Sequence, residues 1–153
     1  MKEIKFRGKR KDTGEWVYGN YFIDERDIED GFIWRDIPQI QQRYGDHYQY
    51  YDVDPTTVGQ YTGLKDTHGR EIYTDDIIRI GEMGGEAGRV IFDTACLAYM
   101  VVNEHQWTGA YRLGDFDGSD ITIVGNIHEN PKLLDVDMSN ECTKGVYMQS
   151  VTP

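Results

Sequence analysis

Three aspartates lie close enough together in the sequence to suggest a metal site. Asp115, Asp117 and Asp120 belong to the segment GDFDGSD, and closely spaced carboxylates can bind calcium. An EF-hand loop that began at Asp115 would need glycine at its sixth position and glutamate at its twelfth, where the sequence has Asp120 and Asn126. We therefore interpret Asp117-Gly118 as the turn of a β-hairpin, and we predict no metal site.

The histidines and the remaining polar residues form no recognisable catalytic motif. The chain has no zinc-ligand spacing, no C-x-x-C pair, no G-x-S-x-G and no phosphate-binding glycine loop; its four histidines are His47, His68, His105 and His128. We predict no catalytic residue, no cofactor-binding residue and no cofactor. One enzymatic alternative stays open, a site assembled from scattered side chains, with the candidate residues Asp66, His68, Glu71 and His105.

The charge distribution bears on the class of partner. The chain has 153 residues and a formal net charge of −11, and only its first eleven residues, MKEIKFRGKRK, are clearly basic. A phosphate-binding surface requires clustered lysine and arginine, so we do not expect nucleic acid as the partner. Nucleic-acid association through this basic hairpin and its neighbouring aromatic residues remains an alternative hypothesis.

Aromatic residues are more abundant than a small β core requires. Exposed tyrosine and tryptophan are typical of protein interfaces, and the candidates are Trp34, Tyr44, Tyr48, Tyr50, Tyr51 and Trp107. Our leading hypothesis is therefore a non-enzymatic protein-interaction module with an unidentified protein partner. We also expect it to self-associate as a homo-oligomer.

The cysteines and the hydropathy indicate a cytoplasmic protein. Cys96 lies in the apolar run TACLAYMVV and is predicted to be a buried thiol, whereas Cys142 lies in a polar tail. No stretch approaches the eighteen apolar residues of a membrane helix, and the N-terminus lacks a hydrophobic signal core. We expect no membrane association.

Short β segments are the elements that would position these residues. Residues 3–22 are predicted to form a β-hairpin around the turn KDTGE (11–15). Residues 23–52 are less regular: the tyrosines around 48–51 favour a strand, but Pro38 argues against a continuous helix or a central strand.

Five further strands are predicted at 76–81, 89–93, 97–103, 110–116 and 121–127, with a glycine-rich loop at 81–88. Asn130 and Pro131 would begin a short helical turn. The predicted fold class is all-β, with a five-stranded SH3-like barrel at 53–135. An N-terminal β-hairpin and an irregular aromatic-rich segment, together 1–52, would precede it as a candidate small subdomain, and 136–153 would be a C-terminal tail.

The segment 59–80, GQYTGLKDTHGREIYTDDIIRI, is the most patterned part of the chain. KDTHGRE has the composition of a tight turn, in which Asp66 accepts backbone N–H bonds and Gly69 takes a positive φ. Leu64 and Ile72 would then face each other across a short hairpin, flanked by Tyr61 and Tyr73. We interpret the pattern as structural rather than catalytic.

Three segments, in this order and spacing, resemble the YopX family of phage and prophage proteins: MKEIKFRGKRKDTGEWVYG, VGQYTGLKDTHGREIYTDDIIRI and IVGNIHENPKLL. The resemblance leaves roughly 24–50 and the tail unmatched. It implies a small all-β protein with an SH3-like barrel, encoded by a phage or prophage in a bacterial host, without an established activity or catalytic residues. The family pattern usually has glycine where this chain has Asp75, a difference that affects the turn rather than the fold.

Overall fold

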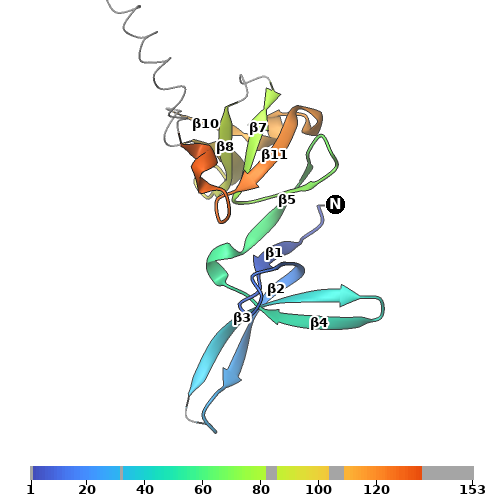
Figure 1. Cartoon of the computed structure of the whole chain (residues 1–153), viewed down its shortest axis with the longest axis vertical. Coiled ribbons are helices and arrows are strands. Elements are labelled where there is room, and N and C mark those ends of the chain that lie inside the picture. Colours follow the sequence, from blue (N-terminus) through green and yellow to red (C-terminus); the bar gives the residue numbers. More distant parts are fainter. Residues whose placement is uncertain (1, 32, 82–85, 104–108, 136–153) are drawn as a thin grey trace, which may run out of the picture. The chain divides into compact units, whose positions relative to one another are not determined.

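The structure is a computed structural model that describes residues 2–31, 33–81, 86–103 and 109–135. In these residues the chain is built of β-strands and short 3-10 turns, so the predicted all-β class is confirmed (Figure 1). No helix in the described part is long and apolar enough to cross a membrane. Backbone contacts divide the chain into two compact units, Met1–Thr74 and Asp75–Pro153.

The first unit is a six-stranded antiparallel sheet with the order β4-β3-β2-β1-β5-β6. Its strands are β1 (Phe6–Lys9), β2 (Trp16–Asp27), β3 (Trp34–Tyr44), β4 (His47–Asp52), β5 (Gly59–Lys65) and β6 (Glu71–Tyr73). The predicted N-terminal hairpin is confirmed, because β1 and β2 pair with Gly8 opposite Val17. β5 and β6 continue this sheet, since β5 pairs with β1. Both strands lie within the range 53–135 that the barrel was predicted to span, but before the five strands predicted for it.

Residues 23–52 form long strands, so the expectation of an irregular segment was wrong. β3 runs without interruption through Pro38, opposite Ile23 of β2. The Pro38 carbonyl accepts a hydrogen bond from the N–H of Val53 at 3.0 Å, whereas the β3–β4 ladder ends at the pair Gln39–Asp52. The N–H that proline lacks would thus face a position just beyond β4, and no bond within that ladder is lost.

Two ribbons leave this sheet in different directions (Figure 1). One is the β3–β4 hairpin. The other, which we call the distal ribbon, consists of the ends of β2 and β3, with Asp24–Asp27 paired to Trp34–Ile37. No third strand pairs with the distal ribbon in the described part of the chain.

The core of the first unit lies under the middle of the sheet. Val17, Ile40 and Val53 are buried, and Phe6, Tyr21, Tyr51 and Val58 pack against them. Closer to β6, the buried guanidinium of Arg7 lies between two aromatic rings, 4.6 Å from the centroid of Trp16 and 5.0 Å from that of Tyr73. Such cation–π contacts allow a cation to be buried within an aromatic layer.

The turn between β5 and β6 forms largely as predicted. The buried carboxylate of Asp66 accepts bonds from the backbone N–H groups of His68 and Arg70, both at 2.9 Å, and Gly69 has a φ of 78°. Leu64 and Ile72, however, are not partners in the ladder. The register changes between Tyr61, which pairs with Tyr73, and Lys65, which pairs with Glu71.

The second unit contains the five predicted strands in one antiparallel sheet, with the order β10-β9-β8-β7-β11. They are β7 (Asp76–Ile80), β8 (Ala87–Asp93), β9 (Ala98–Val102), β10 (Ala110–Arg112) and β11 (Ile121–Asn126). In the described residues the sheet is open, with β10 and β11 at its edges, so a closed SH3-like barrel is not confirmed. Its largest fully buried side chains are Ile77, Ile78, Ile80, Val90, Val101, Leu113 and Ile121.

The connection after β10 differs from the predicted hairpin. The strand ends at Arg112 and is followed by two 3-10 turns, Leu113–Asp115 and Gly118–Asp120. β10 pairs with β9 and β11 pairs with β7, so Asp117-Gly118 does not join paired strands. The Asp117 carboxylate accepts the N–H of Ser119 and begins a 3-10 turn, a local alternative to a hairpin turn that the same residue types favour.

Cys96 is exposed, and the prediction of a buried thiol was wrong. The apolar run that contains it is divided by the turn between β8 and β9. There the Asp93 carboxylate accepts the N–H groups of Ala95 and Cys96, and Leu97 has a φ of 51°. The expected helical turn is present at Pro131–Leu134. Of the glycine-rich loop predicted at 81–88, residues 87 and 88 belong to β8 and residues 82–85 lie outside the described residues, as do His105, Trp107, Cys142 and the tail.

Candidate functional site

The outer edge of β4 is one of the two edges of the sheet in the first unit. β4 is an edge strand whose ladder partner is β3. The N–H of Val53 bonds toward β3, and the carbonyl of Asp52 points the opposite way, accepting the N–H of Lys11 at 3.0 Å. Because backbone groups alternate along an antiparallel strand, those of Tyr48 and Tyr50 also point outward. They have no partner among the described residues.

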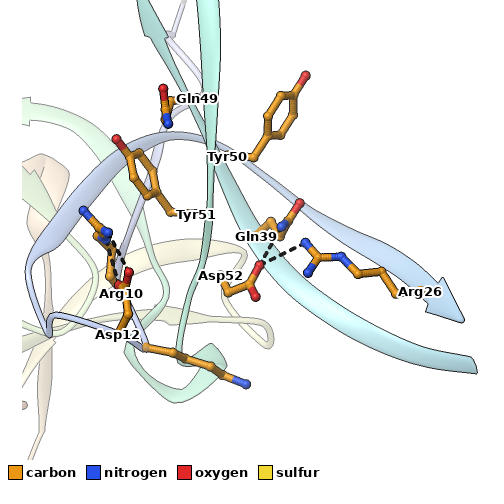
Figure 2. Close-up of a pocket in the computed structure, with 9 residues that line it drawn as sticks. Arg10, Asp12, Arg26, Gln39, Gln49, Tyr50, Tyr51 and Asp52 are labelled. Carbon is orange, nitrogen blue, oxygen red and sulfur yellow. Dashed lines mark hydrogen bonds and ion pairs between the residues drawn. The ribbon is translucent and has the colours of Figure 1, made fainter. Parts of the chain in front are cut away.

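A hollow of about 470 Å³ lies beside this edge (Figure 2). It is lined by Arg10, Lys11, Asp12, Arg26, Gln39, Gln49, Tyr50, Tyr51 and Asp52. Tyr50 and Tyr51 point to opposite sides of β4, with Arg10 on the side of Tyr51 and Arg26 on the side of Tyr50. Side chains from both faces of β4 line the hollow, which is possible only at the edge of a sheet. The hollow therefore runs along the outer edge of β4.

The two guanidinium groups of the hollow are already paired. Arg10 donates to both carboxylate oxygens of Asp12, at 2.9 and 2.6 Å, and lies 4.5 Å from the centroid of the Tyr51 ring. The hydrogen bonds from Arg10 hold the pKa of Asp12 below its usual range. Arg26 donates to Asp52 at 3.1 Å.

Asp52 also accepts a bond from Gln39 at 2.6 Å. Lys11, in contrast, makes no ion pair with a carboxylate of the described residues. The hollow therefore has a framework of paired charges and one available ammonium group.

The tyrosines of β4 and the tip of the β3–β4 hairpin extend the site with aromatic surface. Tyr48 and Tyr50 are 50% and 52% exposed, and Tyr44 is exposed as well; the exposed Trp34 lies in the distal ribbon. The Tyr50 hydroxyl accepts a bond from Gln41, and its ring makes an edge contact with Phe22. Tyr51 instead packs against the core.

Of the enzymatic alternative, Asp66, His68 and Glu71 have structural partners and do not line the hollow, and His105 lies outside the described residues. Asp66 binds two backbone N–H groups and the guanidinium of Arg70 at 2.9 Å, with His68 at 3.9 Å. Glu71 forms an ion pair with Lys5 at 2.8 Å. Among the described residues, no three His, Cys, Asp or Glu side chains are grouped to hold a metal ion.

The basic N-terminal segment presents less free charge than its sequence suggests. Lys5 is paired with Glu71, Arg7 is buried between aromatic rings, and Arg10 is paired with Asp12. A phosphate backbone would have to compete with these internal partners, which weakens the hypothesis of nucleic-acid association.

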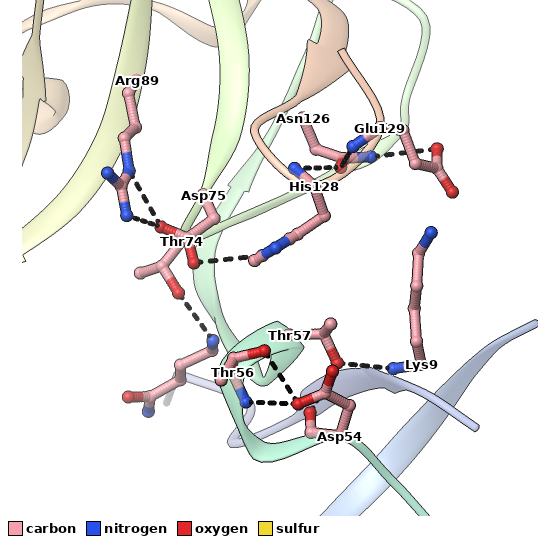
Figure 3. A network of polar contacts seen from close by, with 11 residues as sticks. Lys9, Asp54, Thr56, Thr57, Thr74, Asp75, Arg89, Asn126, His128 and Glu129 are labelled. Carbon is pink, nitrogen blue, oxygen red and sulfur yellow. Dashed lines mark hydrogen bonds and ion pairs between the residues drawn. The ribbon is translucent and has the colours of Figure 1, made fainter. Parts of the chain in front are cut away.

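A second polar cluster lies at the start of the second unit (Figure 3). Asp75 has a φ of 72°, in the left-handed region that favours glycine, which explains the residue type expected there from the family pattern. Its carboxylate accepts two bonds from Arg89 and lies 3.3 Å from Nε2 of His128. Asn126 caps the turn that carries His128, accepting the backbone N–H groups of His128 and Glu129.

These observations define an all-β protein of two antiparallel sheets with an open strand edge. The chain belongs to the YopX family, described as YopX protein, which matches residues 5–135. Among solved structures, the chain is similar to protein EF1440 from Enterococcus faecalis, with 19% identity and a TM-score of 0.49. That match covers 88% of this chain and 100% of the other. No curated protein matches the sequence.

The sequence did not reveal the hollow. Asp12 was interpreted as a turn residue, and Gln39 and Asp52 carry no motif. The useful signals were the tyrosine-rich run at 48–51 and the absence of lysine and proline from it, both typical of an edge that can accept another strand.

Proposed function

We propose that this chain is a non-enzymatic protein-interaction module that binds an extended segment of another polypeptide along the outer edge of β4. The observation that carries this proposal is the unpaired outward backbone of Tyr48 and Tyr50 beside a hollow lined from both faces. An added strand gains main-chain hydrogen bonds, and its alternate side chains reach the two sides of the edge.

The composition of the edge supports binding rather than protection. Natural proteins usually protect edge strands with lysine, proline or a bulge, and β4 has the sequence HYQYYD and a regular ladder to β3. Tyrosine supplies large contact areas at low entropic cost, and the exposed rings of Tyr48 and Tyr50 flank the open backbone.

Selection of short random peptides against the immobilised chain tests the proposal. Selected peptides are then measured by calorimetry against Tyr48→Pro, which removes one outward N–H, and Tyr48→Ala, which removes the ring but keeps that N–H. We expect binding to weaken more with proline than with alanine, by about fivefold or more, the value of one net backbone hydrogen bond. If no selected peptide distinguishes the two variants, strand addition at β4 is wrong.

A further inference from the structure

The occupant of the β4 edge can be inferred from its charge and register. We infer that it is the β4 strand of a second copy of this chain, paired antiparallel about a twofold axis. This inference rests on the proposed function, because it names the partner of the same site.

Local charge favours self-association at this place. A chain with a net charge of −11 repels its own copies, so a self-contact should lie where charges balance. Around β4 and the hollow the charges nearly balance, with four cations and five carboxylates: Arg10, Lys11, Arg26 and Arg43, and Asp12, Glu15, Asp24, Asp46 and Asp52. By contrast, the segment 24–30, DERDIED, has five carboxylates and one guanidinium, a net charge of −4, and would repel its copy.

One self-complementary register of β4 pairs the outward groups of Tyr48 with those of Tyr50. Tyr48 of each copy would lie opposite Tyr50 of the other, so the outward N–H and C=O groups of both residues find partners in the second copy. Gln49 would face Gln49 of the second copy. Tyr48 and Tyr50 are two residues apart and lie on the same face, so each forms a cross-strand aromatic pair, an arrangement that stabilises antiparallel sheets.

The residues of the hollow lie where the paired β4 strands would end. Lys11 occupies the backbone position next to Asp52, where the open edge of β4 stops. In the register above, the paired strand of the second copy ends at His47, opposite Tyr51, and its Gly45-Asp46 turn lies beside Lys11. Asp46 is fully exposed, and Lys11 has no carboxylate partner among the described residues. The two side chains would therefore form an ion pair across the interface, twice in the dimer.

Analytical ultracentrifugation over a range of concentrations tests the inference. The unaltered chain should dimerise, Tyr48→Pro should weaken dimerisation by about tenfold or more, since two equivalent bonds are lost, and Tyr48→Ala should weaken it less. Lys11→Glu and Asp46→Lys should each weaken dimerisation, and the double variant should restore it. If Lys11 or Asp46 acted only within its own copy, the double variant would not restore dimerisation. Circular dichroism of every variant should show the unaltered β spectrum.

Three outcomes overturn the inference. They are a monomer up to about 100 μM, a dimer equally sensitive to Tyr48→Pro and Tyr48→Ala, and charge-reversal variants whose effects simply add. The proposed function has its own test: peptides that bind the monomer and distinguish Tyr48→Pro from Tyr48→Ala would retain strand addition while rejecting the second copy as the partner.

Discussion

Arg89 donates two hydrogen bonds to Asp75, at 3.0 and 2.8 Å, from β8 to the residue that precedes β7. Asp75 combines this ion pair with a left-handed backbone. The two properties can be separated by substitution, because glycine removes the carboxylate and the strain together, whereas alanine removes the carboxylate alone.

We expect Asp75→Ala to lower the free energy of unfolding by about 2 kcal/mol, from lost hydrogen bonds with the strain retained. Asp75→Gly should lose about 1 kcal/mol less, because glycine adopts this φ without strain. Urea denaturation followed by circular dichroism measures both. Equal losses in the two variants would show that the backbone at position 75 is not strained.

Gly125 lies at the register shift of β11, against the side chain of Asn130. A Cβ at position 125 would come within 2.9 Å of the Cβ and Cγ atoms of Asn130. Gly125→Ala should therefore lower the free energy of unfolding by about 1–3 kcal/mol, the usual cost of overpacking. Gly114→Ala is the matched control, since no atom lies within 4 Å of its added Cβ, and it should be nearly neutral. A neutral Gly125→Ala would contradict the packing of Asn130 on this strand.

The buried hydroxyl of Tyr73 should lower the free energy of unfolding at alkaline pH. Burial raises the pKa of Tyr73 above its ordinary value of 10. The folded state thus holds this proton more tightly than the unfolded state. The stabilisation is complete below pH 10 and decreases as the pH rises above it, by up to about 1.4 kcal/mol per pH unit.

Tyr73→Phe removes this titrating group and should show a shallower decline in the free energy of unfolding above pH 10. Urea denaturation of both proteins at neutral and alkaline pH provides the comparison. Tyr61 and Lys5, whose pKa values are also raised, are present in both proteins. Their contributions to the pH dependence therefore cancel in the comparison. Parallel declines would mean that the Tyr73 hydroxyl is solvated in the folded protein.

Cys96 should react in the native protein. Its place in the turn between β8 and β9 leaves the thiol exposed. In a Cys142→Ser background Cys96 is the one remaining cysteine of the chain. We expect a thiol reagent to label one equivalent without denaturant, measured by absorbance or mass spectrometry. Labelling that requires denaturant would restore the original prediction of a buried thiol.

Local pattern was enough to predict most strands. Alternating apolar residues located β1, β2 and the five strands of the second unit, and the turn chemistry of Asp66 and Gly69 was evident from their residue types. These features depend on neighbours within a few residues. Cys96 shows the limit: an apolar run looks continuous in sequence even where a turn divides it.

Long-range pairing could not be predicted in the same way. The hollow exists because Lys11 pairs beside Asp52, a contact between distant residues that no local signal specifies. Pro38 was misleading for a related reason, since its effect depends on which neighbour faces its missing N–H. The course of the chain after Arg112 likewise depends on which strands β10 and β11 join.

The backbone hydrogen bonds of the distal ribbon should be short-lived. A two-stranded ribbon without a third strand is marginally stable in water. Its amide protons, between Asp24 and Ile37, should therefore exchange for deuterium well before those at the centre of β2. A protease at low concentration should make its first cut in the first unit at the end of this ribbon, between Ile28 and Ile33.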